Sequence, residues 1–406
     1  MKLNKLLWSE NAKTAILFIT GAILIFFMLD AKSLWTMEQR WASIINNMLI
    51  RHDYLHPYLG NRQYYDKPLL SYWLILPFVK LFGFHRWTLR LPSAIAGFLA
   101  LWTTYRIGYH LKNKSLGLIA GWLLLSSYFF IFYARVASAD MLNIFAILAA
   151  FLYYLKKFSS LTSHSKQTFI DYLILFLILT FGALCKGLVA PVCVFLIVLP
   201  DLIKQRAWKT HFNFKMFSAL IIAALIYFIP FLLSSYINKN DYQTSGLTRV
   251  LYENFVRFVH PWDHKNPAWH YFIEFPVMIS PWIIFFLPAL YISIKKWSRM
   301  PWNTRWLCLA FALLFIFFTL SRSRRFYYLL PLLPIAILIT SDWLNERMQQ
   351  QKLQNITAGL VILIVIALFL LNGIILPMHY MKKRGGQHDI RIPPKYSALV
   401  SARSCG

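Results

Sequence analysis

Charged side chains stand close together in the first segment that follows the apolar N-terminal run. Within residues 30–69 the chain places Glu38 near Arg40 and, farther on, Asp66 beside Lys67. A carboxylate can take a proton from a hydroxyl group, whereas a guanidinium or ammonium group can stabilise a leaving phosphate. A loop between two membrane segments has no structural need for such side chains. The pattern therefore indicates a reaction at a membrane surface.

The elements that must position these residues are apolar helices. The chain has 58% hydrophobic and only 14% charged residues, whereas soluble domains average about 25% charged. A helix needs ~20 residues to cross the hydrocarbon layer, and strands of a membrane barrel would alternate polar and apolar residues. The sequence therefore predicts an all-α, polytopic membrane helix bundle. Long apolar runs that lead to this prediction include residues 14–29, 216–233, 308–320 and 356–371.

The distribution of basic loops predicts the topology, because short loops rich in Lys and Arg face the cytoplasm. About eleven spans result, with the N-terminus inside and the first run kept as an uncleaved span. Residues 70–84 are then expected to form a re-entrant or interfacial helix, since Pro77 and Lys80 interrupt them. The basic loops are Lys13, 112–114, 156–166, 204–215, 295–305 and 347–352.

The remaining charged groups gather on the predicted outer face. Basic residues there oppose the insertion bias, so an anionic head group or phosphate would explain them. The net charge of +27 fits membrane phospholipid, and the chain shows no basic helix with interleaved base-stacking aromatics, which argues against nucleic acid. The residues concerned are Glu38, Arg40, Asp53, Asp66, Lys67, Arg135, Asp140, Lys186, Arg257, His264, Arg322, Arg324 and Arg325.

Motifs in this order resemble the GT-C glycosyltransferases related to protein O-mannosyltransferases and lipid A aminoarabinose transferases. The similarity extends over nearly all of Ala15 to Leu338. The motifs are residues 38–42 (EQRWA), 64–73 (YYDKPLLSYW), 81–83 (LFG), 90–93 (RLPS), 134–135 with Asp140, 186–187 (KG), 281–282 (PW) and 325–331 (RFYYLLP).

The resemblance implies an inverting glycosyltransferase that uses a polyprenyl-phosphate sugar as donor. The acceptor would be a glycolipid such as lipid A, a polysaccharide or a protein, at the periplasmic or outer face of the plasma (inner) membrane. Glu38 would be the general base, while Asp66 and Asp140 would orient the donor or a divalent cation. The residues expected to bind the carrier phosphate are Arg40, Lys67, Arg325, Tyr327, Tyr328 and Lys186.

Two positions depart from the family pattern. Met37 precedes Glu38 where the family usually has an aspartate, so the base is displaced by one position or replaced. Asn254 stands where the lipid A branch commonly has a histidine, which leaves His260 and His264, with Asp66, as weak candidates for a metal site. A divalent cation therefore remains an open question at this point.

Simpler interpretations remain for several residues. Asp140 could cap the following helix, Lys186 could extend to the membrane interface, and His264 with His270 could belong to an aromatic interfacial belt. The alternative function is a transporter or flippase of a lipid-linked glycan, although the repeats typical of such carriers are not evident. We expect one membrane domain over residues 1–380 and a disordered tail over residues 381–406.

Overall fold

The computed structural model describes residues 9–65, 67–161, 166–206, 208–237, 248, 266–347 and 350–378. These residues confirm the predicted all-helical architecture, with a two-stranded antiparallel hairpin as an addition that the sequence did not predict. The hairpin consists of β1 (Tyr58–Leu59) and β2 (Arg62–Gln63). The expected tail and the segment around His260 and His264 lie outside the described residues, as does Asp66.

The helices follow one another along the chain with short connections. The first half contains α2 (Glu10–Phe26), α3 (Thr36–Arg51), α4 (Leu70–Trp73), α5 (Leu76–Phe82), α6 (Arg86–Leu111), α7 (Lys114–Leu125), α8 (Tyr128–Ala134), α9 (Asp140–Lys157), α10 (Phe169–Lys186) and α11 (Val189–Gln205). The second half contains α12 (Trp208–His211), α13 (Phe214–Tyr236), α16 (His270–Ile279), α17 (Ile283–Lys295), η2 (Trp297–Arg299), α18 (Trp302–Leu320), η3 (Phe326–Leu329), α19 (Leu332–Arg347), α20 (Gln351–Leu370) and the π-helical turn η4 (Leu371–Ile375).

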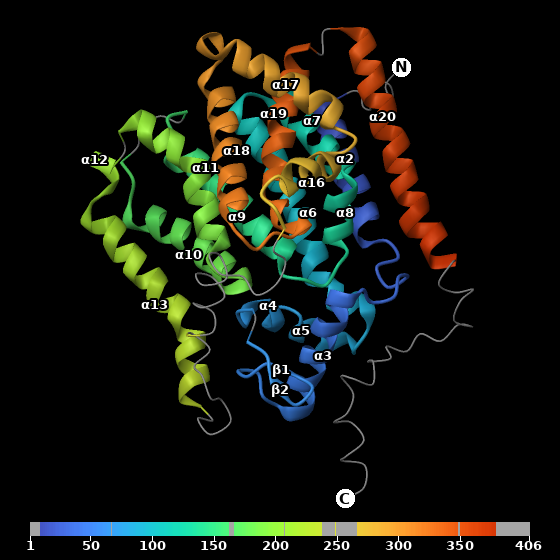
Figure 1. Cartoon of the computed structure of the whole chain (residues 1–406), viewed down its shortest axis with the longest axis vertical. Helices are drawn as coiled ribbons and strands as arrows, with labels where there is room; N and C mark the ends of the chain where they lie inside the picture. The colour runs from blue at the N-terminus through green and yellow to red at the C-terminus, as the bar shows by residue number, and fades with distance from the viewer. Residues whose placement is uncertain are drawn as a thin grey trace, which may run out of the picture.

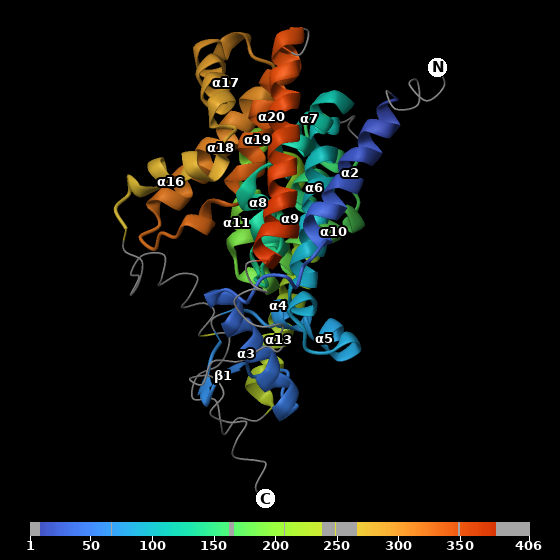
Figure 2. The same ribbon diagram turned by 90° about the vertical axis from the view of Figure 1, so that its right-hand side faces the viewer.

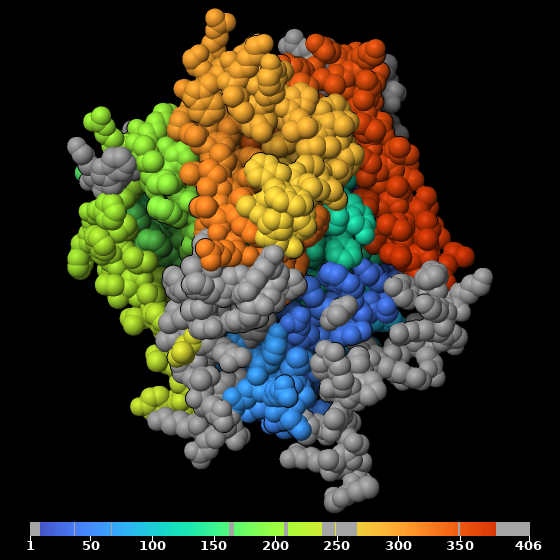
Figure 3. Space-filling view, viewed as in Figure 1, coloured from blue at the N-terminus to red at the C-terminus, as the bar shows by residue number. Residues whose placement is uncertain are grey.

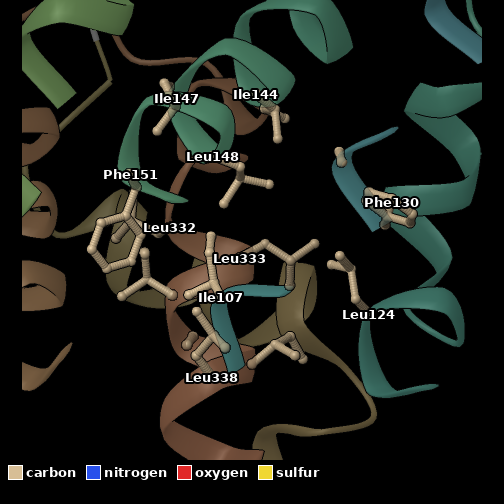
Figure 4. Packing of buried hydrophobic residues seen from close by; sticks show 14 of the residues in the cluster. Ile107, Leu124, Phe130, Ile144, Ile147, Leu148, Phe151, Leu332, Leu333 and Leu338 are labelled. Carbon is tan, nitrogen blue, oxygen red and sulfur yellow. The ribbon is translucent and has the colours of Figure 1, made fainter. Parts of the chain in front are cut away.

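The core of the bundle lies between helices that are apolar on all sides, as expected for helices buried in a bundle or in lipid. Side chains from α6, α7, α8, α9 and α19 meet there (Figure 4). Nearly every residue of α19 from Leu332 to Asp342 is buried, whereas α20 lies at the outer edge of the bundle with most of its surface exposed (Figure 1). The central helices are therefore covered by protein, and the peripheral ones present apolar surface to lipid.

Fewer continuous spans are visible than the sequence predicted. Four described helices are long and apolar enough to cross a membrane: α10, α13, α18 and the helix over Gln351–Met378. Two bent pairs, α7 with α8 and α16 with α17, turn by 72° and 115° and raise the number to six at most. The predicted count of about eleven is not confirmed. The segment expected not to cross, residues 70–84, forms the short helices α4 and α5.

The first loop forms a small layer at one end of the bundle (Figures 1 and 2). Its elements α3, β1, β2, α4 and α5 pack around their own apolar cluster, which includes Trp41, Leu69 and Tyr72. The same cluster contains Ala139 and Ala183, which lie at the start of α9 and near the end of α10. The loop that carries the first motifs is thus packed against the helix ends that carry the later ones.

Candidate active site

Glu38 lies completely buried in the first turn of α3 and is bound by Arg90 of α6. Arg90 donates from Nε to Oε1 over 2.7 Å and from Nη2 to Oε2 over 2.8 Å. The backbone N–H groups of Trp35 and Ala137 donate to the same carboxylate, each over 2.9 Å. A carboxylate has about four lone-pair sites, so all of them are occupied. This geometry does not favour Glu38 as the general base that the sequence suggested.

Two arginines hold the segment that leads into α3. Arg90 and Arg135 point their guanidinium groups at backbone carbonyls that follow α2, which would otherwise be unpaired at the helix end. Sequence analysis placed Arg135 among the outer charges without identifying this contact. The carbonyls bound by Arg90 belong to Leu29, Lys32 and Ser33, and those bound by Arg135 belong to Leu24, Ile25, Phe27 and Met28.

Lys32 lies in this arginine-bound segment, with its Nζ 4.2 Å from the ring centroid of Phe132. Burial lowers the pKa of the Lys32 ammonium group; Glu38 partly opposes this effect, and the positive charges of Arg90 and Arg135 add to it. The first loop therefore enters the bundle through a region where several cations are partly removed from water.

A second cluster joins the later motifs, and its centre is an ion pair between Lys186 and Asp140. Asp140 is the first residue of α9 and Lys186 the last residue of α10, where the helix dipoles favour an acid and a base respectively. Ala139, not Asp140, occupies the N-cap position of α9, and no side-chain cap bond forms there. The ion pair therefore agrees better with a site role for Asp140 than the simple cap does.

Aromatic and basic residues of η3 complete this cluster. The Nζ atom of Lys186 lies 5.5 Å from the ring centroid of Tyr327 and 5.7 Å from that of Tyr328. Arg325 donates from Nη1 to the hydroxyl oxygen of Tyr327 over 2.6 Å. Four of the six predicted phosphate-binding residues are thus brought together, although they are up to 142 positions apart in the chain (186 to 328).

The other two predicted phosphate-binding residues lie in the first-loop layer. Arg40 donates from Nη1 to the hydroxyl of Tyr64, and its guanidinium carbon lies 5.6 Å from the centroid of the Tyr64 ring. Lys67 is partly buried between Tyr65 and Pro68. Burial raises the pKa of the Tyr65 phenol, so that phenol remains protonated. These residues are attached to the ends of α9 and α10 through the apolar cluster that they share.

A buried histidine that sequence analysis did not single out fastens the same layer to α13. The Nδ1 atom of His56 lies 2.9 Å from Oδ2 of Asp53, and its Nε2 atom lies 2.8 Å from the carbonyl oxygen of Ser234. The sequence offered only the spacing of Asp53 and His56 as a signal, because Ser234 is 178 positions away from His56.

No metal site is formed by the described residues, which contain no group of three or more His, Cys, Asp or Glu side chains suited to a metal ion. The sequence candidates Asp66, His260 and His264 lie outside that part of the chain. The described cysteines, Cys185, Cys193 and Cys308, are buried and unpaired.

Known proteins share both sequence and fold with this chain. Residues 66–233 match the family of dolichyl-phosphate-mannose-protein mannosyltransferases. The undecaprenyl phosphate-alpha-4-amino-4-deoxy-L-arabinose arabinosyl transferase 1 of Proteus mirabilis is 26% identical over 87% of this chain and 63% of its own length. The corresponding transferase of Pseudomonas aeruginosa strain UCBPP-PA14 is 26% identical over 82% of this chain and 59% of its own length. The chain thus spans about three fifths of these relatives.

Solved structures give the same answer for the fold. ArnT from Cupriavidus metallidurans bound to undecaprenyl phosphate superposes with a TM-score of 0.68 at 19% identity, covering 82% of this chain and 60% of ArnT. The oligosaccharyltransferase AglB from Archaeoglobus fulgidus, in complex with an inhibitory peptide and a dolichol-phosphate, gives 0.52 at 12% identity over 92% of this chain and 56% of AglB. The resemblance found in the motifs is confirmed: this chain has the GT-C glycosyltransferase fold.

Proposed function

We propose that this chain transfers a sugar from a polyprenyl-phosphate carrier to an acceptor at the outer face of the inner membrane. The observation that carries the proposal is the cluster of Lys186, Arg325, Tyr327 and Tyr328 around Asp140. Cationic and phenolic donors at one helix end suit a phosphate group. The relatives named above act on an undecaprenyl phosphate aminosugar, and one fold neighbour binds undecaprenyl phosphate.

The carrier phosphate would be held by Lys186 and Arg325, with Arg40 and Lys67 of the first-loop layer as further cations. An ammonium group has three N–H donors, so Lys186 can keep its bond to Asp140 and still reach a phosphate oxygen. Positive charge at the bridging oxygen lowers the barrier because negative charge develops there as the bond to the sugar breaks.

The reaction would be a single displacement with inversion. An acceptor hydroxyl attacks the anomeric carbon while the bond from that carbon to the phosphate oxygen breaks, so polyprenyl phosphate leaves. A carboxylate takes the hydroxyl proton. Because Glu38 is fully hydrogen-bonded, we assign the proton to Asp140 or Asp66, in place of the sequence assignment to Glu38. A divalent cation bound by Asp66, His260 or His264 would act beside the same phosphate.

We further propose the predicted topology, with about eleven spans and one membrane domain over residues 1–380. Support comes from the separation of the charges. The cluster and the first-loop layer lie at one end of the bundle, whereas Lys112 belongs to the connection between α6 and α7 and pairs with Asp342 and Glu346 over 2.8 and 3.1 Å. Charges gathered at one end suit bond exchange better than a transport route across the bilayer.

The test is sugar transfer in membranes that contain the chain. Labelled polyprenyl-phosphate sugars, one with an aminopentose and one with a neutral hexose, are followed into lipid, polysaccharide and protein fractions. We expect transfer with the wild-type chain and a loss of about 100-fold or more with Lys186→Ala, the scale seen when a charge-stabilising donor is removed.

Lys204→Ala is the matched control. Lys204 is exposed near the other end of α11, with its Nζ 4.4 Å from the centroid of the Trp302 ring, so its loss should leave transfer unchanged. Absence of transfer from every donor would contradict the proposal. Movement of the intact labelled carrier between leaflets, without bond exchange, would replace the transferase with the transporter alternative.

A further inference from the structure

A cavity of about 480 Å³ lies beside the Lys186–Asp140 cluster. Its walls come from the segment before α3, from α8, from α16 and from η3, and they include Trp35, Phe129, Phe132, Tyr133, Glu274 and Tyr327. In Figure 3 the teal side chains of the α8 region are visible in a recess between α16 and α20, above the blue first loop. The volume falls in the range of small-molecule sites, ~300–1,000 Å³.

The walls of this cavity are mainly aromatic. Trp35 meets Phe132 edge to face with ring centroids 5.6 Å apart, and Tyr133 lies 6.2 Å from Tyr327. Contacts of this kind fix the rings relative to one another. Their faces can cover the apolar face of a sugar ring, and they attract a positively charged group on a ligand.

One carboxylate oxygen in this cavity has no partner within the described part of the chain. Oε1 of Glu274 lies 2.9 Å from Nε2 of His270, one helical turn earlier, whereas Oε2 is buried and accepts no hydrogen bond from the described residues. A buried, unsatisfied charged acceptor costs more than a neutral one. A ligand that donates an N–H or O–H group to Oε2 would remove this cost.

The cavity is joined to the proposed phosphate site by a shared residue. Tyr327 lines the cavity, accepts the hydrogen bond from Arg325, and has its ring beside Lys186. A group bonded directly to a phosphate held by Lys186 and Arg325 therefore has the aromatic walls within reach.

We propose that this cavity is the subsite for the transferred sugar and that Glu274 accepts a hydrogen bond from an N–H or O–H group on the sugar ring. The inference rests on the proposed function and adds to it a residue that selects the donor. An ammonium substituent would gain both from the carboxylate and from the ring faces, while a hydroxyl would gain only the hydrogen bond.

Binding, measured on the purified chain in lipid nanodiscs, separates the sugar from the phosphate. The ligands are polyprenyl phosphate without a sugar, the same carrier with an aminosugar, and the same carrier with a neutral sugar. Glu274→Gln should weaken a sugar-loaded carrier by about tenfold or more, because a charge-assisted hydrogen bond is lost, and should leave the unloaded carrier unchanged.

The two loaded carriers then identify the group that is recognised. A larger loss for the aminosugar than for the neutral sugar assigns an ammonium group to Glu274, and an equal loss assigns a hydroxyl; both results support the inference. Unchanged binding of both loaded carriers would overturn it, as would an equal loss for loaded and unloaded carriers. Failure of the wild type to bind any of the three carriers would instead remove the proposed function.

Two further variants protect this result. Trp35→Ala removes one partly exposed wall of the cavity and should weaken the loaded carriers without affecting the unloaded one. Glu346→Gln changes a carboxylate that pairs with Lys112 outside the cavity and should affect none of the three. Retained binding of unloaded carrier shows in each case that the variant is folded.

Discussion

At the scale of single residues, the Glu38–Arg90 pair shows the limit of sequence motifs. The motif correctly marked Glu38 as a residue with a defined partner, but that partner lies 52 positions away and is buried with it. Nothing in the local sequence indicates that two more donors, the N–H groups of Trp35 and Ala137, saturate the carboxylate. By contrast, the sequence identified Asp140, Lys186, Arg325 and Tyr327 as site candidates, since charges at a membrane face stand out.

We expect Glu38→Gln to destabilise the protein more than it affects chemistry. The substitution leaves the Arg90 charge buried without its counter-ion, and breaking a buried pair costs about 3–5 kcal/mol. Arg90→Met should cost a similar amount, and the double variant should cost less than the sum of the two. Thermal unfolding in detergent measures these effects. A Glu38→Gln protein that is as stable as wild type and yet inactive in sugar transfer would restore Glu38 as the base.

At the scale of elements, apolar runs predicted helices well and bends poorly. The runs over residues 216–233, 308–320 and 356–371 lie within α13, α18 and α20 with its π-helical extension. The 72° bend between α7 and α8 left no signal in hydropathy, because both halves are apolar. Its cause is local: the hydroxyls of Ser126 and Ser127 donate to the carbonyls of Trp122 and Leu123 over 2.6 and 2.8 Å, and such bonds compete with the helical pattern.

The glycine that ends α10 sets the position of Lys186. Gly187 has φ 81° and ψ −167°, a region essentially restricted to glycine. Gly187→Ala should therefore cost of order 1–3 kcal/mol and lower transfer, since the backbone next to Lys186 must shift. Gly359→Ala in α20 is the matched control, because its added methyl group would meet nothing within 4 Å. Unfolding temperature and transfer rate check both variants, and a Gly187→Ala protein with wild-type values would contradict the assigned role.

At the scale of the whole molecule, charge asymmetry predicted more than hydropathy could. The first-loop layer and the ends of α9 and α10 share an apolar cluster, as expected if their charged motifs face one side of the membrane. The number of spans could not be predicted equally well, because bent pairs and short helices such as α4 and α5 divide the apolar runs. Pairing across the bundle, as between Lys112 and Asp342, depends on packing that no local pattern reveals.

Labelling of single cysteines tests this arrangement in intact cells. Four exposed positions serve as reporters: Arg62 and Arg322 on the proposed outer side, and Lys166 and Lys352 on the inner side. In a background without the native cysteines, an impermeant thiol reagent should modify Arg62→Cys and Arg322→Cys, whereas Lys166→Cys and Lys352→Cys should react only after the membrane is opened. The cysteine-free chain supplies the baseline. Modification of Lys166→Cys from outside would place basic loops on both faces, and the argument that a phosphate site explains the outer cations would fail.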